Sequence, residues 1–150
     1  YSKGNLTQTD RNFIDNAIAY MNLDDIRHQY IDNLSGGQRQ RAYIAMTLAQ
    51  DTDYILLDEP LNNLDMKHSV QIMQVLRKLA TELNKTVVIV IHDINFASCY
   101  SDYIVAMKNG KLVHQGEVNH IMQSPVLQDI YDMAIPIQDI DDHKIAVYFR

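Results

Sequence analysis

The sequence has a single cysteine, Cys99, and therefore offers no pair for an internal disulfide. A lone cysteine suits a protein of a reducing compartment. The longest apolar run, Val87 to Ile91, has the length of a strand and falls short of the roughly 18 residues that indicate a membrane-spanning helix. No signal peptide is evident either. The composition thus favours neither a disulfide-stapled secreted domain nor an integral membrane protein.

Basic residues are also scarce, because 13 Lys and Arg stand against 19 Asp and Glu and give a net charge of −6. A chain of this charge without a basic run is a poor candidate for binding nucleic acid. The hydrophobic share of 47% is large enough to form a core, and 150 residues make about one domain. The chain begins at Tyr1, without Met and inside a polar stretch, and we expect it to be part of a longer protein.

Apolar spacing predicts alternating helices and strands, with no repeat and no low-complexity segment. The expected strands are Tyr54–Leu57, Thr86–Ile91 and Tyr103–Met107, the second of them a buried parallel strand because it is rich in β-branched residues. The expected helices cover residues 8–21, 24–30, about 36–49, 70–83 and 95–100, and one begins with Ser124 as its cap and Pro125 at its first position. Strands alternating with helices in this way indicate an α/β fold.

Two hairpins complete the expected layout. Asn109-Gly110 between apolar runs is a strong hairpin signal and connects the strand ending at Met107 to residues 111–115. Residues 135–138 and 144–149 are expected to form a second hairpin around Asp141-Asp142.

The first candidate site is the string L-S-G-G-Q-R-Q-R at residues 34–41, where a helix is expected to begin. Ser35 can cap this helix, and Gln38 stands where a capping box places Glu or Gln. Gly36 and Gly37 leave backbone N–H groups bare at the positive end of the helix dipole, which favours an anion. A lone Ser-Gly-Gly would be an ordinary turn, whereas the full string is much more specific.

The second candidate site follows a buried strand that ends in Asp58-Glu59-Pro60. Ligands bind at the carboxyl ends of strands in open α/β folds. Successive strand side chains point to opposite faces, so the two acids cannot share one task unless the strand ends before Glu59. We expect Asp58 to face a hydrated Mg²⁺ and Glu59 to face an attacking water. A solvated loop after a core strand is the alternative.

The third candidate is His92, directly after the β-branched strand. It could contact a γ-phosphate or position a water, although taken singly it fits a satisfied polar residue at a strand end. The other histidines show no spacing typical of metal ligands, and we interpret them as surface residues without a protein-bound transition metal. These are His28, His68, His114, His120 and His143.

In this order, the sites resemble the carboxyl-terminal part of the ATPase of ATP-binding-cassette (ABC) transporters. Leu34–Gln38 resembles the family signature, Ile55–Glu59 the Walker B strand with its catalytic glutamate, and His92 the switch histidine. Residues 62–65, Asn-Asn-Leu-Asp, stand at the D-loop position. The resemblance extends over essentially all 150 residues.

The resemblance implies a P-loop NTPase (RecA-like) core. Residues 1–50 would belong to the helical subdomain with the signature helix, and residues 51–150 to the carboxyl-terminal part of the core with its terminal hairpins. It also implies ATP and Mg²⁺, bound between two copies of the ATPase arranged head to tail.

Each site residue gains a role by the same resemblance. The γ-phosphate bound by the partner copy would face residues 35–38, that is Ser35, Gly36, Gly37 and Gln38. Asp58 would hold the Mg²⁺ shell through water, Glu59 would polarise the attacking water, and His92 would steady the γ-phosphate. Asp65 would link the two sites across the interface. Such roles suit phosphoryl transfer, which depends on positioning and charge stabilisation.

The sequence departs from the family in two ways. Asn62 and Asn63 are larger than the usual D-loop residues. The 150 residues also contain no G-x-x-x-x-G-K-[ST], no glutamine loop and no base-stacking aromatic of the amino-terminal sheet. We therefore expect the chain alone not to hydrolyse ATP. The parallel sheet would lack its P-loop strand, between the strand before His92 and Tyr103–Met107. The unpaired edges predict association, a rearranged sheet or marginal stability.

Two stretches, residues 59–69 and 92–102, resemble ATPases of iron(III)-siderophore importers of Gram-positive bacteria. ATPases of haem or cobalamin importers are the near alternative. Non-transport ABC ATPases of DNA repair or the ribosome are less favoured, because residues 1–33 lack sustained heptads and no basic linker is visible. The resemblance implies permease subunits as partners, indirectly an extracellular solute-binding lipoprotein, and no nucleic acid. It places the protein peripherally on the cytoplasmic face of the membrane.

Overall fold

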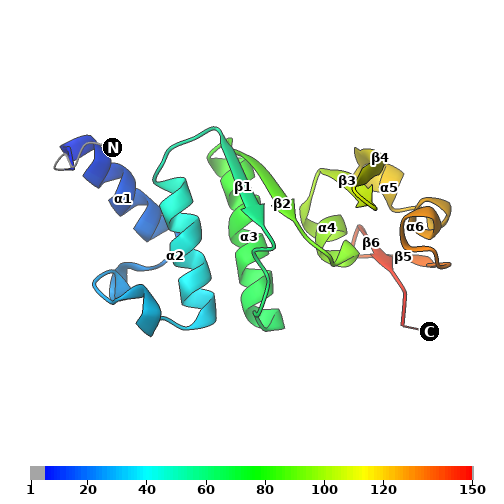
Figure 1. Ribbon diagram of the computed structural model, residues 1–150, viewed down its shortest axis with the longest axis horizontal. Helices are drawn as coiled ribbons and strands as arrows, with labels where there is room; N and C mark the ends of the chain where they lie inside the picture. Colours follow the sequence, from blue (N-terminus) through cyan, green and yellow to red (C-terminus); the bar gives the residue numbers. More distant parts are fainter. Residues whose placement is uncertain (1–5, 150) are drawn as a thin grey trace. The chain divides into compact units, whose positions relative to one another are not determined.

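The structure is a computed structural model that describes residues 6–149 (Figure 1). The chain forms two compact units, of which the first ends at Val90 and the second begins at Ile91. The boundary expected near residue 50 concerns the subdomains of the family and stays a prediction.

The first unit begins with helices. α1 (Gln8–Tyr20) is followed by two short 3-10 turns, η1 (Asp24–Ile26) and η2 (Ile31–Asn33), and by α2 (Gly36–Leu48). The expected helix over 24–30 is wrong, since only the turn η1 forms there. No side chain caps η1, and its three residues are too few for a turn of α-helical hydrogen bonds.

The remaining elements of this unit are β1 (Tyr54–Asp58), α3 (Met66–Glu82) and β2 (Thr86–Val90). β1 and β2 are parallel and in register from Tyr54 opposite Thr86 to Asp58 opposite Val90. α3 packs against this two-stranded sheet and buries Ile72, Met73, Leu76 and Leu79 (Figure 1).

The sheet has one covered face and one open face. Ile55 is 1% exposed, whereas its neighbour Leu56 is 70% exposed. β2 alternates in the same way, and Val88 and Val90 are each about half exposed. The expectation of a strand buried on both faces is therefore wrong for β2 in this chain, because a single layer of helix covers the pair.

The second unit contains α4 (Ile94–Tyr100), β3 (Tyr103–Lys108), β4 (Lys111–Glu117), α5 (Val118–Ile121) and α6 (Ser124–Tyr131). It ends with β5 (Ile137–Ile140) and β6 (His143–Ala146). Both expected hairpins are confirmed, as β3 pairs with β4 and β5 with β6, each antiparallel. Asn109 and Gly110 have φ values of 51° and 73°, the left-handed geometry that a tight hairpin turn requires.

One helix start differs from the expectation. Ser124 is the first residue of α6 rather than its cap, and the cap position is held by Gln123 without a side-chain bond. The chain already turns into the helix at Ser124, so Pro125 alone fulfils its expected role in the first turn.

The second unit has its own closed core. Ile121, Leu127 and Ala146 have no exposed surface. Asn95 fixes α4 to β6 with two bonds, since its amide donates to the Ala146 carbonyl (3.1 Å) and its oxygen accepts from the Ala146 N–H (2.7 Å). The Ser98 hydroxyl adds a bond to the Lys144 carbonyl at 2.6 Å.

Within residues 6–149, the six strands form three separate pairs, so β2 pairs only with β1 and β3 only with β4. This agrees with the expectation that both strands have an unpaired edge in this chain. Over the same described residues, no helix is both long and apolar enough to cross a bilayer.

Candidate functional site

The N-terminus of α2 forms a reciprocal capping box. Ser35 Oγ accepts from the Gln38 N–H (3.3 Å), and Gln38 Oε1 accepts from the Ser35 N–H (3.0 Å). The first bond within the helix runs from the Arg39 N–H to the Ser35 carbonyl at 2.8 Å. The N–H groups of Gly36 and Gly37 therefore belong to the first turn that a helix cannot bond internally. Two bare N–H groups at the positive end of a helix dipole fit a phosphate.

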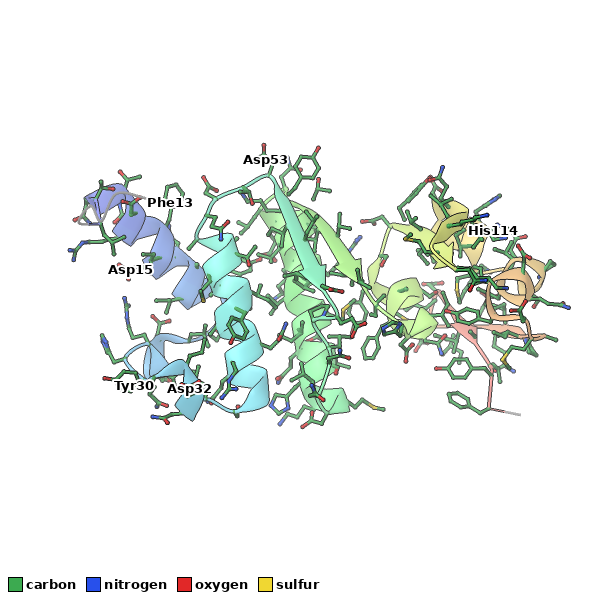
Figure 2. All side chains as sticks on the ribbon, viewed as in Figure 1. Phe13, Asp15, Tyr30, Asp32, Asp53 and His114 are labelled. Atoms are coloured by element: carbon green, nitrogen blue, oxygen red, sulfur yellow. The ribbon has the colours of Figure 1, made fainter. Side chains whose placement is uncertain are left out.

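The turn that precedes this site is tied to the same helix. The Arg39 guanidinium donates to the main-chain carbonyl of Asp32 in η2 at 3.1 Å. Asp32 and Tyr30 lie together just before the signature string (Figure 2). This bond reaches back across the site and fixes how the chain enters α2.

Gly37 is buried, although Ser35 and Gly36 beside it are exposed. A Cβ at Gly37 would lie 2.6 Å from Cδ2 of His68, and a Cβ at Gly36 would lie 3.7 Å from a methyl carbon of Leu64. Real Cβ atoms do not approach a ring atom at 2.6 Å, so any side chain at position 37 would force the His68 ring to move. The predicted phosphate site thus lies directly against the predicted D-loop.

Asp65 and His68 are joined at the start of α3. Asp65 Oδ1 accepts from the His68 N–H at 2.9 Å, and His68 Nδ1 lies 2.8 Å from Asp65 Oδ2. The backbone and then the side-chain hydrogen bond from His68 hold the pKa of Asp65 below its usual value. The carboxylate is therefore ionised at neutral pH and can only accept, which places the proton of the ring on Nδ1.

The interpretation of His68 as a surface residue agrees with its partial exposure but leaves out its contacts. Its side chain is 39% exposed, and the ring lies between the Asp65 carboxylate and Gly37. The spacing of three residues from Asp65 at a helix start was the available signal for the first contact. The contact with Gly37 depends on how α2 and α3 pack and has no signature in the sequence.

The two acids after the Walker B-like strand are separated by the end of that strand. β1 ends at Asp58, which is exposed, and Glu59 adopts a left-handed φ of 47°. Its N–H still donates to the Val90 carbonyl at 3.1 Å. A left-handed glutamate is an uncommon backbone state that its surroundings must hold in place. The strict alternation of a strand thus stops before Glu59, and the two carboxylates are free to take different tasks.

Asn62 contacts the Glu59 side chain, because its amide donates to the carboxylate oxygen Oε2. The larger residue at this D-loop position therefore has a partner in the site. Asn63 follows with a left-handed φ of 60°, a conformation that asparagine tolerates better than most residues.

His92 belongs to the second unit and is exposed between β2 and α4. Asp93 caps α4, since its Oδ1 accepts from the N–H groups of Asn95 (2.8 Å) and Phe96 (3.1 Å). The backbone next to His92 is therefore fixed. His92 also lines a pocket with Tyr131 and Tyr148, where burial and then the charge of Asp93 raise the pKa of both phenols.

Of the other histidines, His114 is also more than a surface residue. Its Nε2 lies 2.7 Å from a carboxylate oxygen of Asp129, and its side chain is only about one third exposed. The pair joins β4 to α6 and has a structural role.

The donor set for a metal is sparse. Among residues 6–149, no group of three or more His, Cys, Asp or Glu side chains converges on a metal position. The exposed carboxylate of Asp58 is a hard oxygen ligand at a strand end. One carboxylate fits Mg²⁺, which keeps most of its waters and takes further ligands from a bound phosphate.

Comparisons with known proteins agree with these observations. A family model described as ABC transporter matches residues 3–62. The chain is 63% identical over 149 residues to the petrobactin import ATP-binding protein YclP of Bacillus subtilis (strain 168) and 51% identical over 148 residues to FatE of Bacillus anthracis, which has the same description. Each match covers 99% of this chain but 59% of the relative, so the chain spans about three fifths of their length.

Solved structures of ABC proteins are also similar to this chain. An inward-facing ABC transporter described as of metal-chelate type matches with a TM-score of 0.87 at 25% identity, over 99% of this chain and 61% of that one. The dimeric ATP-binding cassette MJ0796, bound to ADP and Pi, matches with a TM-score of 0.64 at 34% identity, over 78% of this chain and 51% of that one. The motifs, the sheet and these relatives together show that the chain belongs to the ABC transporter family of ATP-binding proteins.

Proposed function

We propose that the whole protein to which these residues belong is the ATP-hydrolysing subunit of an ABC importer, and that it energises uptake of an iron(III)-siderophore complex. The observation that carries the activity is the start of α2, where two glycines of the unbonded first turn pack against Leu64 of the D-loop and against His68. The cargo rests on the names of the two petrobactin-import relatives and on the stretches 59–69 and 92–102.

The proposed site is completed by a second copy of the ATPase, arranged head to tail. Ser35, Gly36, Gly37 and Gln38 of one copy bind the γ-phosphate of ATP held by the other copy. The helix dipole and the Gly36 and Gly37 N–H groups supply the attraction. The capping box keeps the Ser35 and Gln38 side chains in place beside them. Dimeric MJ0796, a relative of known structure, is a precedent for the pairing.

The two acids divide the chemistry at the end of β1. Asp58 orients the hydration shell of Mg²⁺, and Glu59 accepts a hydrogen bond from the attacking water and directs it toward the γ-phosphate. Mg²⁺, when bound, offsets negative charge on the phosphate oxygens. Asn62 holds the Glu59 carboxylate in one orientation. His92 steadies the γ-phosphate, and Asp65 links the two sites across the dimer.

The whole protein must also supply what the 150 residues do not contain. The P-loop lysine and backbone amides are the main contacts of the β- and γ-phosphates in P-loop ATPases. We therefore expect the chain alone to be inactive toward ATP. Residues of the whole protein outside this chain would also cover the open face of β1 and β2, where Leu56, Val88 and Val90 are exposed.

Haem and cobalamin import remain alternatives for the cargo, because the importer ATPases of these cargoes have similar motifs. A DNA-repair ABC ATPase is less favoured. Ahead of the signature, residues 6–33 form one 13-residue helix and two 3-10 turns instead of a long coiled coil. A ribosome-associated ATPase is likewise less favoured, because no basic linker occurs in these residues.

The proposed partners are a second copy of the ATPase and integral permease subunits, with an extracellular solute-binding lipoprotein acting through the permease. This role places the protein on the cytoplasmic face of the membrane as a peripheral subunit. Neither partner class requires nucleic acid.

Two measurements test the proposal. ATP hydrolysis by the purified whole protein should be lost in Glu59→Gln, and an inactive wild type would refute the ATPase role. Uptake of radiolabelled iron(III)-siderophore should fall when the gene is deleted and return with the wild-type gene but not with Glu59→Gln. Haem and cobalamin uptake are measured in the same strains. Unchanged siderophore uptake with reduced haem or cobalamin uptake would reassign the cargo.

A further inference from the structure

His68 touches two parts of the proposed ATP site that come from different elements. Its Nδ1 lies 2.8 Å from Oδ2 and 2.9 Å from Oδ1 of Asp65, the residue that caps α3. Its ring carbons lie so near Gly37 of α2 that a Cβ there would be 2.6 Å away. The ring is thus fixed on one side by a carboxylate and on the other by the start of the signature helix.

We propose that His68 is a positioning residue for ATP hydrolysis, which holds the start of α2 at a set distance from Asp65. The inference rests on the proposed ATPase function and adds a residue to it. Through His68, the Gly36 and Gly37 N–H groups and the Asp65 carboxylate form one rigid arrangement, although they belong to two helices. A second contact strengthens it, since Leu64 lies against Gly36.

The chemistry of the ring explains why histidine suits this position. Asp65 is ionised and can only accept, so Nδ1 donates to it. The flat ring then presents its opposite edge to Gly37, where any Cβ would displace it. A side chain that cannot donate to Asp65, such as leucine, would satisfy at most the packing contact, whereas the planar amide of glutamine can both donate and pack.

The chain contains a matched control. In the second unit, His120 lies against Gly116, with the ring atom Cδ2 3.2 Å from where a Cβ would be. His120 therefore makes a similar contact between a histidine and a glycine, but at a place with no proposed role in catalysis. A general cost of removing such a contact would appear equally in His68→Ala and His120→Ala.

The test uses the whole protein and measures kcat for ATP hydrolysis, the Kd for ADP and Tm. ADP lacks the γ-phosphate that the signature faces, so its Kd should stay within about twofold in every His68 variant. We expect His68→Ala and His68→Leu to lower kcat about tenfold. His68→Gln, whose amide can donate to Asp65, should restore kcat to within about threefold of wild type. His120→Ala should leave kcat unchanged.

A double-mutant cycle provides a second test. Gly37→Ala alone should lower kcat because its methyl group displaces the ring of His68. Adding His68→Ala should then lower kcat less than the product of the two single effects, since the clash is gone. Independent effects, or equal kcat for His68→Gln and His68→Leu, would overturn the proposal. If wild type hydrolyses ATP while every His68 variant matches it, only this inference fails. If wild type is inactive, the proposed function fails and this inference with it.

Discussion

The two units differ in how their cores are held together, although each leaves apolar strand residues exposed, such as Leu56 in β1 and Met107 in β3. In the second unit, Ile121, Leu127 and Ala146 are fully enclosed, and Asn95 ties α4 to β6 by two hydrogen bonds. In the first unit, the sheet is covered by α3 on one face, while Leu56 on the other is 70% exposed.

We call the first unit the open unit, because one face of its sheet is uncovered. It also contains most of the residues of the proposed site. The N–H groups at the start of α2, the Asp58 and Glu59 carboxylates and Asp65 all lie where a helix begins or a strand ends. The first N–H groups of a helix have no partner within that helix, and the carboxyl ends of strands are where ligands bind in open α/β folds. His92 comes from the second unit, where Asp93 caps α4 and holds the neighbouring backbone in place. Most of the proposed ligand groups thus lie in the first unit, which also has an uncovered sheet face, whereas the second unit contributes His92.

The largest expected effect tests where the chemistry lies. In the whole protein, Glu59→Gln should reduce ATP turnover by a factor of about 10²–10⁴, the usual range for losing a general base. Glu117→Gln provides the control, because Glu117 is also exposed at the end of a strand but lies in the second unit. Steady-state hydrolysis measures both variants. Equal losses in the two would contradict the assignment of chemistry to the open unit.

Truncating a side chain in the buried core of the second unit should lower the free energy of unfolding. Leu127→Ala removes a fully buried side chain and should lower the free energy of unfolding by about 2–5 kcal/mol. Leu56→Ala, on the open face, should cost about 0.5 kcal/mol or less in the 150-residue chain. In the whole protein, Leu56→Ala should become clearly more destabilising if other residues cover that face. Urea denaturation compares the variants, and an equal cost of Leu56→Ala in both contexts would contradict the proposed cover.

A smaller effect is expected at Asn62, whose amide donates to the proposed general base. A hydrogen bond to a charged group contributes about 1.5–3 kcal/mol. Because this bond is exposed to solvent, we expect the lower end of that range, so Asn62→Ala should lower kcat about tenfold with ADP affinity unchanged. Asn63→Gly serves as the control because glycine accepts the left-handed φ of 60° at that position. A wild-type kcat in Asn62→Ala would show that Glu59 needs no such support.

Much of the fold could be predicted from the sequence where the signal is local. The Ser35–Gln38 capping box and the Asn109-Gly110 turn depend on neighbouring residues, and both are present. The helix expected over residues 24–30 does not form, because no side chain caps the segment and only a three-residue 3-10 turn is present. Ser124 shows the same limit, since a serine before proline fits either the cap or the first helical position.

The site could be predicted as a set of residues but not as an arrangement. Ser35, Asp58, Glu59, Asp65 and His92 were identified from motifs, and their roles stay predictions. The contact of His68 with Gly37 depends on the packing of α2 against α3, which periodicity does not encode. The left-handed φ of Glu59 is equally hidden, because glutamate rarely adopts it and only the surrounding fold enforces it.

The smallest expected effect concerns a link within the open unit. The Tyr20 hydroxyl of α1 donates to the Glu82 carboxylate of α3 at 3.1 Å. Burial, followed by the hydrogen bond and charge of Glu82, raises the pKa of Tyr20 to about 12. The folded state thus favours the neutral phenol, whose ordinary pKa is about 10. Its stabilisation is present below pH 10 and is lost as the pH rises toward 12.

Tyr20→Phe should accordingly lower the free energy of unfolding at neutral pH by less than about 1 kcal/mol, because the pair is largely solvent-screened. The variant should also lose less stability than wild type between about pH 10 and 12. Tyr100, Tyr131 and Tyr148 also have raised pKa values but are present in both proteins, so the difference between the two curves isolates Tyr20. Parallel curves would show that the bond between Tyr20 and Glu82 is not what holds α1 to α3.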